Sequence, residues 1–268
     1  MVKDINEVQL SQEDLCDLHI AKSKLEYPGL TARITDLIGQ PIEEGFKLLP
    51  KKINKKIGEV TQMALLKGLE FAVLTMGENE KRISHDWLHK LLIAGSGIAG
   101  GFAGFSSLSL ELPISTCIIL RSIADIARSE GHNIRHLEVK LSCLEILALG
   151  GTKKEHDSVN SGYWAIRSTL AKSVSEAAAF IAEKGLAEKG APPLLRLIAA
   201  IASRFSVVIT EEVAAKAIPI VGAVAGGTIN VLFINHFQEM ARGHFIVMRL
   251  ENKYGTELVE NMYNEIEV

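Results

Sequence analysis

Charged and polar side chains occur at helical spacing inside otherwise apolar stretches, and their types could support chemistry. Arg121, Asp125 and Arg128 fall at positions i, i+4 and i+7, on one face of an isoleucine-rich helix. A buried ion is costly unless it is paired, so these charges predict a structural salt-bridge network or a functional site. Such a site would bind a phosphate or carboxylate ligand, or perform acid–base chemistry. The whole polar constellation comprises Glu111, Arg121, Asp125, Arg128, Glu145, Asn230, His236, Glu239, Arg242 and His244.

The balance of positive and negative charges predicts which members of the constellation contact one another. Asp125 can pair with the arginine one turn before it and with the arginine nearly one turn after it. One positive charge is then left over, and we expect Glu111, Glu145 or Glu239 to neutralise it. We also expect the charged face to meet the last long helix. If a ligand supplies the missing anion instead, the same face is a binding site.

A second group of charges is basic and is interleaved with apolar residues. No acidic residue lies between Glu44 and Glu59. Lysines on the first turn of a helix oppose its macrodipole, and a bound anion would relieve that repulsion. A basic amphipathic segment can lie in the interface of a membrane with anionic headgroups, and it can equally be a solvated helix face. The lysines are Lys47, Lys51, Lys52, Lys55 and Lys56, and Phe46, Leu48, Leu49, Ile53 and Ile57 interleave with them.

Two long stretches carry no charge. One runs for twenty residues over 91–110 and the other for nineteen residues over 217–235, and each is about long enough to span a bilayer. Their serines, asparagines and proline lower the propensity to insert, so a buried hairpin and membrane insertion both stay open. Glycines four apart let two helix backbones approach closely. The packing glycines are Gly97, Gly100, Gly101, Gly104, Gly222 and Gly226.

Motifs for cofactors and metals lack the context that they need. Residues 95–100 read GxGxxG, a pattern of dinucleotide sites, but no βαβ alternation follows, and we favour helix packing there. His85 and His89, like His132 and His136, have a spacing that suits a metal, but no third ligand is fixed. P-loop and GxSxG motifs are absent from the sequence. We therefore expect no cofactor and no metal.

The composition narrows the class of protein. Hydrophobic residues make up 47% of the chain, which excludes wholesale disorder. The 29 basic and 32 acidic residues nearly cancel, so we do not expect a nucleic-acid partner. The three cysteines include no CxxC pair, which argues against a disulfide scaffold or a thiolate zinc site. A reducing, cytoplasm-facing location fits this usage best.

Apolar residues recur at helical spacing along nearly the whole chain, and alternation typical of strands is lacking. We predict an all-α protein: a globular bundle of about ten helices, whose two glycine-rich uncharged helices are packed closely or associated with a membrane. Residues 1–268 form one domain, with a possible internal linker at 152–162 and a short acidic C-terminal helix within 256–268. The expected helices are 11–24, 31–38, 41–49, 50–76, one from 84, 113–130, 137–149, 163–188, 194–217, 221–253 and 256–265.

Four blocks of this sequence resemble the EcsC protein family of bacteria. They are YPGLTAR at 27–33, ELPISTCIILRSIADIARSEG at 111–131, LSCLEILALGG at 141–151 and IPIVGAVAGGTINVLFINHFQEMARGHF at 218–245. The similarity extends over about residues 25–255. The resemblance implies a mainly helical protein, and the family takes its name from an operon that encodes an ABC transporter. It implies no particular activity and no catalytic residues.

We therefore favour a membrane-associated helical protein that binds anionic membrane lipids or a membrane protein such as a transporter. We expect it on the cytoplasmic side of the inner membrane, bound peripherally or inserted conditionally. The alternative is a hydrolase-like enzyme that uses the buried His/Asp/Glu/Arg constellation. A third reading, an adaptor for a membrane transporter, rests mainly on the family name.

Overall fold

The computed structural model describes residues 10–26, 29–39, 42–75, 108–150, 162–186, 190–218 and 226–267. Within these ranges the chain forms ten α-helices and no strand, which confirms the all-α prediction. The helices are α1 (Gln12–Glu26), α2 (Leu30–Ile38), α3 (Glu43–Leu48), α4 (Ile53–Thr75), α6 (Leu108–Ser129), α7 (Leu137–Leu149), α8 (Gly162–Lys184), α9 (Pro192–Ala217), α11 (Gly226–Tyr254) and α12 (Thr256–Glu265).

Local sequence signals account for most of the helix boundaries. The backbone N–H of Asp14 donates to the Ser11 side chain at 3.2 Å, which is one half of the predicted capping box. The other half is absent, because the Ser11 backbone N–H donates to the Tyr254 hydroxyl at 3.2 Å while Ser11 Oγ donates to the Asp14 carboxylate at 2.6 Å. The helix expected from Pro113 begins five residues earlier, at Leu108, so the proline lies inside α6. Pro113 has no backbone N–H, so the i→i−4 hydrogen bond of that position is missing from the second turn of α6.

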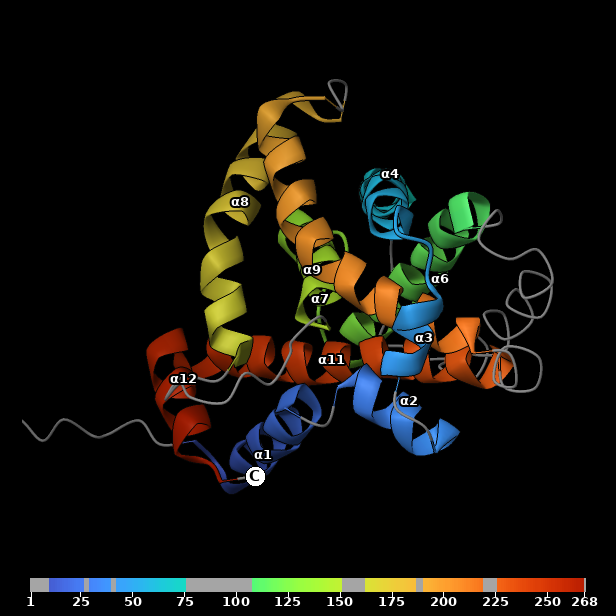
Figure 1. The fold of residues 1–268 in the computed structure, drawn as a ribbon. Coiled ribbons are helices and arrows are strands. Elements are labelled where there is room, and N and C mark those ends of the chain that lie inside the picture. The colour runs from blue at the N-terminus through green and yellow to red at the C-terminus, as the bar shows by residue number, and fades with distance from the viewer. Residues whose placement is uncertain are drawn as a thin grey trace, which may run out of the picture.

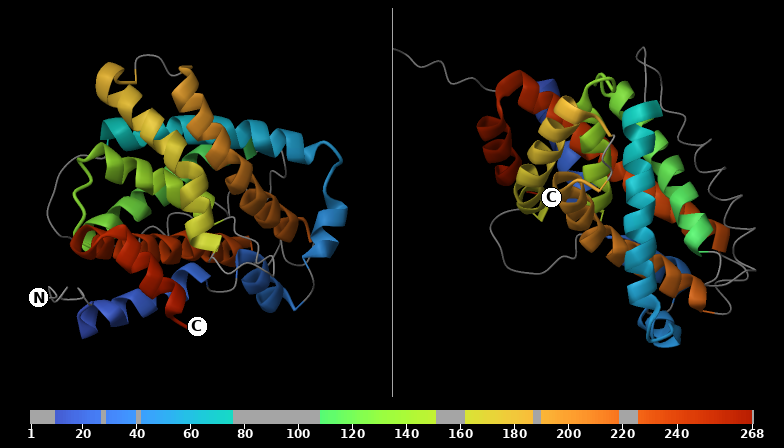
Figure 2. Two further views of the ribbon diagram at one scale, coloured as in Figure 1. Left: turned by 90° about the vertical axis from the view of Figure 1, so that its left-hand side faces the viewer. Right: turned by 90° about the horizontal axis from the view of Figure 1, so that it is seen from above.

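Two long helices, α9 and α11, organise the bundle. In Figure 1, α11 runs across the lower part of the molecule and α9 descends diagonally towards it. Helix α11 packs against α1, α2, α6, α7, α9 and α12, while α9 packs against α3, α4, α7 and α8. The left view of Figure 2 shows α4 crossing behind α9, and α8 packs alongside α9. Elements distant in sequence therefore meet on these two helices.

The core is continuous from the first helix to the last. Leu18 of α1 and Tyr263 of α12 are both fully buried and belong to the same apolar cluster. Helix α7 lies deepest, and every residue from 141 to 150 is buried. Because the buried part of α7 is enclosed on all sides, apolar residues occur around its circumference instead of along one stripe, with Ser142 and Glu145 as the polar exceptions.

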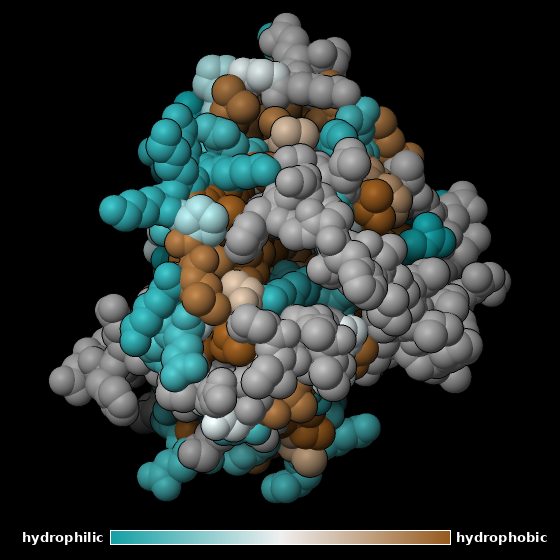
Figure 3. All heavy atoms as spheres, turned by 45° about the vertical axis from the view of Figure 1, so that its right-hand side comes forward, coloured by the Kyte–Doolittle hydropathy of each residue, from teal (hydrophilic) through white to brown (hydrophobic). Residues whose placement is uncertain are grey.

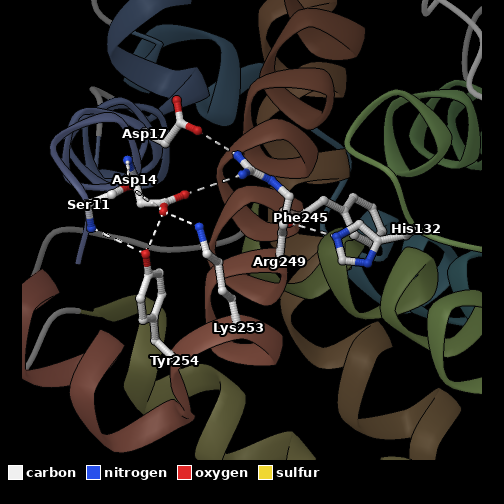
Figure 4. Close-up of polar contacts among 8 residues, drawn as sticks. All are labelled: Ser11, Asp14, Asp17, His132, Phe245, Arg249, Lys253 and Tyr254. Carbon is white, nitrogen blue, oxygen red and sulfur yellow. Dashed lines mark hydrogen bonds and ion pairs between the residues drawn. The ribbon is translucent and has the colours of Figure 1, made fainter. Parts of the chain in front are cut away.

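Polar contacts fasten α1 to the end of α11 (Figure 4). The carboxylate of Asp14 accepts hydrogen bonds from Lys253 Nζ at 2.6 Å and from the Tyr254 hydroxyl at 2.7 Å. Arg249 binds Asp17 at 2.7 Å and lies 3.7 Å from Asp14. The hydrogen bond from Lys253, and then those from Ser11 and Tyr254, hold the pKa of Asp14 well below its ordinary value.

A close backbone approach continues this contact along α11. A Cβ at Gly243 would lie 2.6 Å from Leu25 Cγ and 2.9 Å from the Ala21 carbonyl oxygen of α1. Only glycine permits this approach, since any side chain would push the two helices apart. The glycines expected in this role, at 97, 100, 101, 104 and 222, lie outside the described residues, and Gly226 is the first residue of α11.

The first uncharged stretch and the linker lie almost wholly outside the described part of the chain, whereas most of the second stretch lies inside it. The first stretch reaches it only at 108–110, the start of α6, and the second is divided between the end of α9 and the start of α11. Of the expected linker only Gly162 is described, as the first residue of α8. Among the described residues, α9 alone is long and apolar enough to cross a membrane, a property that buried core helices share.

Replacing Asp14 by Asn tests the contact between α1 and α11. We expect the free energy of unfolding at neutral pH to fall by about 1–2 kcal/mol, because charge-assisted hydrogen bonds at a partly solvated site are lost. Since the folded pKa is depressed, the stabilisation is present above the ordinary carboxyl pKa and disappears as the pH falls through the folded pKa. Wild type and variant should therefore converge in acid.

Urea unfolding across the acid range measures this difference, with Glu13→Gln as the control because Glu13 is an exposed carboxylate on the same turn. A constant gap between Asp14→Asn and wild type at every pH would contradict the electrostatic explanation.

Candidate functional site

The structure divides the expected polar constellation into separate contacts. Asp125 and Arg128 form an ion pair within α6, so part of the local pairing is present. Arg121, which we expected on the same buried face, is exposed. The three residues therefore do not form one buried charged stripe directed at α11.

Glu111 lies at the other end of α6 and contacts α9. Its carboxylate is 3.8 Å from Lys216 Nζ, which also binds Glu212 at 2.7 Å. Burial acts to lower the pKa of Lys216, but Glu212 and Glu111 outweigh it, and the pKa is raised above its ordinary value. This lysine stays charged and links the C-terminal turn of α9 to the N-terminal turn of α6.

The polar residues of α11 contact several different elements. His236 Nε2 lies 2.8 Å from the carbonyl oxygen of Gly150, at the end of α7. Glu239 binds Arg33 of α2 at 2.8 Å. Asn230 is buried near the start of α11. Arg242 is half-buried and, with Arg249, opposes the upward shift that burial causes in the pKa of Glu130.

The densest buried group of titratable side chains joins α7, α8 and α11. Arg167 of α8 binds Glu251 of α11 through two parallel hydrogen bonds of 3.0 Å each. The Arg167 guanidinium also lies over the ring of Trp164, 4.9 Å from the ring centroid. Glu145 of α7 is 7% exposed and is coupled electrostatically to both members of the pair. We call Glu145, Tyr163, Arg167, His244 and Glu251 the Glu145 cluster.

The remaining two members of the Glu145 cluster are neutral. The Tyr163 hydroxyl lies 3.0 Å from His244 Nδ1, and both side chains are buried. Burial raises the pKa of Tyr163 and, together with Arg167, lowers the pKa of His244 well below its ordinary value. His244 Nε2 has no hydrogen-bond partner among the described residues. The imidazole is therefore uncharged at neutral pH.

The Glu145 cluster holds two carboxylates against one guanidinium. Because Glu251 occupies both outer nitrogens of Arg167, Glu145 is left in a buried site with little compensation. Burial raises the pKa of Glu145 to about 7, although Arg167 acts against the shift. A carboxyl group that titrates near neutrality can exchange a proton at physiological pH.

Sequence reasoning found Glu145 and His244 but missed Tyr163, Arg167 and Glu251. A usable signal existed, because Arg167 interrupts the apolar run YWAIRSTL in the same way that Arg121 interrupts its helix. What the sequence lacked was any indication that α8 and α11 would bring Arg167 and Glu251 together.

The basic segment forms an exposed corner where α3 meets α4. Four of its lysines are exposed and Lys56 is half-buried. Phe46 and Leu48 lie among them with 39% and 53% of their surface exposed. On the face that Figure 3 turns forward, hydrophobic side chains emerge in small groups between hydrophilic ones. We call the basic segment and its two exposed apolar residues the lysine corner: Phe46, Lys47, Leu48, Lys51, Lys52, Lys55 and Lys56.

The histidine pairs give no metal site in the part of the chain that the structure describes. His132 Nε2 lies 2.8 Å from the carbonyl oxygen of Phe245, and His136 is the residue just before α7. No group of three or more His, Cys, Asp or Glu residues among the described positions could hold a metal ion. His85, His89 and the glycine motif at 95–100 lie outside those positions.

Replacing Glu145 by Gln tests the raised pKa. Above the ordinary carboxyl pKa the folded protein must either hold a proton on Glu145 or bury its charge, so wild-type stability falls as the pH rises from that value to about 7 and is level above it. Glutamine does not ionise, so the variant should be more stable than wild type by about 2–3 kcal/mol in mild alkali. The two proteins should converge in mild acid.

The measurement is urea unfolding across the neutral range. Glu138→Gln is the control, since Glu138 is exposed on the same helix. Parallel stability profiles for wild type and Glu145→Gln would show that folding does not raise the pKa of Glu145.

Comparison with known proteins places the chain in a family. A family model described as the EcsC protein family matches residues 12–250, from the start of α1 to near the end of α11. No curated protein and no solved structure gives a match. The matched range includes the lysine corner and all of the Glu145 cluster except Glu251. Since it covers far more than half of the sequence, the chain belongs to the EcsC protein family.

Proposed function

We propose that this protein binds anionic lipid surfaces peripherally, through the lysine corner, on the cytoplasmic side of the inner membrane. The observation that carries the proposal is the exposure of Phe46 and Leu48 between exposed lysines on one short stretch of the surface. Large apolar side chains in water are unremarkable singly, but a pair framed by one sign of charge suits an interface that is both apolar and anionic.

The charges of the lysine corner favour a lipid surface over a structural role. Lys51 and Lys52 directly precede α4, and Lys55 and Lys56 lie in its first turn. Positive charge at that end of a helix is repelled by the macrodipole, and anionic headgroups would remove the repulsion. Lys55 contacts Glu59 at 3.8 Å, but both side chains are largely solvated, so the pair contributes little.

A charge-reversal series tests the electrostatic part of the proposal. Each lysine close to an anionic surface contributes about 1 kcal/mol, so Lys51→Glu, Lys52→Glu and Lys55→Glu combined should weaken vesicle binding at low salt at least about a hundredfold. The measurement is cosedimentation with vesicles that contain phosphatidylserine. The control combines Lys67→Glu, Lys172→Glu and Lys184→Glu, which are exposed elsewhere and change the net charge equally.

The two outcomes that oppose the proposal are distinct. Equal losses in both triple variants would mean that net charge, and no particular surface, determines binding. If wild type failed to bind protein-free anionic vesicles at all, a membrane protein would replace lipid as the partner.

Replacing Phe46 and Leu48 by Ser tests the apolar part. The binding that persists at high salt should fall about tenfold or more, because two side chains no longer leave water. The control is Met63→Ser with Leu195→Ser, since these residues are comparably exposed on α4 and α9. Unchanged binding at high salt in the Phe46/Leu48 variant would limit the lysine corner to electrostatic attraction.

A further inference from the structure

The short helix α3 rests on the C-terminal end of α9 through a glycine. A Cβ at Gly45 would overlap the carbonyl oxygen of Ala214, and it would lie 2.7 Å from the Ala214 carbonyl carbon and 3.3 Å from Ile218 Cγ1. Gly45 is also the one buried residue among those of α3. The glycine is therefore where α3 touches the body of the protein.

The surface beneath α3 cannot yield to an added side chain. The obstructing atoms belong to the backbone of α9, and α9 is held by its packing against α4, α7 and α8. The adjoining Lys216 is bound to Glu212 and lies near Glu111 of α6. A Cβ at Gly45 would consequently displace α3. The two atoms nearest to it belong to the backbone of Ala214, which cannot move aside as a flexible side chain could.

The exposed residues of α3 follow directly after this contact. Phe46, Lys47 and Leu48 are all exposed, while Ile42, just before the helix, is buried. With Ile42 and Gly45 fixed against the body, the three residues that follow must project outward from a set height above α9. Exposure of Phe46 and Leu48 is thus a consequence of the Gly45 contact.

We infer that Gly45 is a positioning residue for lipid insertion: its close approach to Ala214 and Ile218 holds α3 so that Phe46 and Leu48 enter the membrane. This inference rests on the proposed function. Gly45 itself would not touch lipid, and its role is to fix the distance and direction of the side chains that do.

The test places a reporter at one inserting position. Leu48→Trp introduces an indole whose fluorescence brominated lipids quench on contact, and the signal of the parent chain, which carries Trp87 and Trp164, is subtracted. The vesicles contain about one third phosphatidylserine, with brominated phosphatidylcholine as the remainder. Gly45→Ala is then added to the reporter variant. The matched control is Gly58→Ala, because Gly58 is a helical glycine of neighbouring α4 with no atom within 4 Å of an added Cβ.

We expect quenching in the reporter variant and in its Gly58→Ala derivative, and loss of most of that quenching in its Gly45→Ala derivative. Salt-sensitive binding should persist in all three, since the lysines are unchanged. Equal quenching with Gly45→Ala would overturn the inference while leaving lipid binding intact. Absence of binding by the reporter variant and wild type alike would overturn the proposed function itself.

Circular dichroism and thermal unfolding show whether Gly45→Ala folds. If it does not, Ile218→Ala provides the second variant, because it removes the side chain nearest to Gly45 on the α9 side without adding a clash. We then expect weaker quenching at unchanged salt-sensitive binding. Quenching equal to that of the reporter variant would again overturn the inference.

Discussion

Polar side chains line α11, and the buried ones among them require partners because an unsatisfied buried group is costly. Their partners come from different helices, so these polar contacts fix the surrounding helices to α11. Glu239 holds α2, His236 holds the end of α7, His244 and Glu251 hold α8, and Lys253 holds α1. Gln238 adds α6 by donating to Ser122 at 2.7 Å. The same helix is thus both a hydrophobic centre and the place where the surrounding helices are fixed in register.

Local structure could be predicted from the sequence where the deciding interactions are local. Two helices, Leu137–Leu149 and Thr256–Glu265, begin and end at the expected residues, and Ser11 accepts the expected hydrogen bond from the Asp14 backbone N–H at the start of α1. Partners across the bundle could not be predicted in the same way. A helical spacing says which residues share a face but does not say how deeply each is buried, and Arg121 is exposed although Asp125, one turn later, is half-buried. Glu111 pairs with Lys216, which lies about a hundred positions further along the chain. Nothing in the sequence of either segment predicts that the two residues lie close together.

The Glu145 cluster and the lysine corner differ in how their charges are compensated. In the cluster, ordered hydrogen bonds satisfy Arg167 and Glu251, and the excess carboxyl group is accommodated by its raised pKa. No external ion is needed for that balance at neutral pH, which favours a structural role that links α7, α8 and α11. At the corner most of the positive charges face solvent beside exposed apolar groups, so an external anion has access to them.

The packing of α9 also bears on how such a surface would meet a membrane. By composition α9 could cross a bilayer, yet one side of it is buried against α4, α7 and α8, and its end carries the Lys216 ion pairs. Inserting it would expose the apolar partners of α9 and break Lys216 away from Glu111 and Glu212. Contact through α3 requires none of these losses, because Phe46 and Leu48 are exposed already. The energetic difference between the two modes lies in the core contacts that only insertion breaks, and it favours peripheral binding with α9 serving as the support for α3.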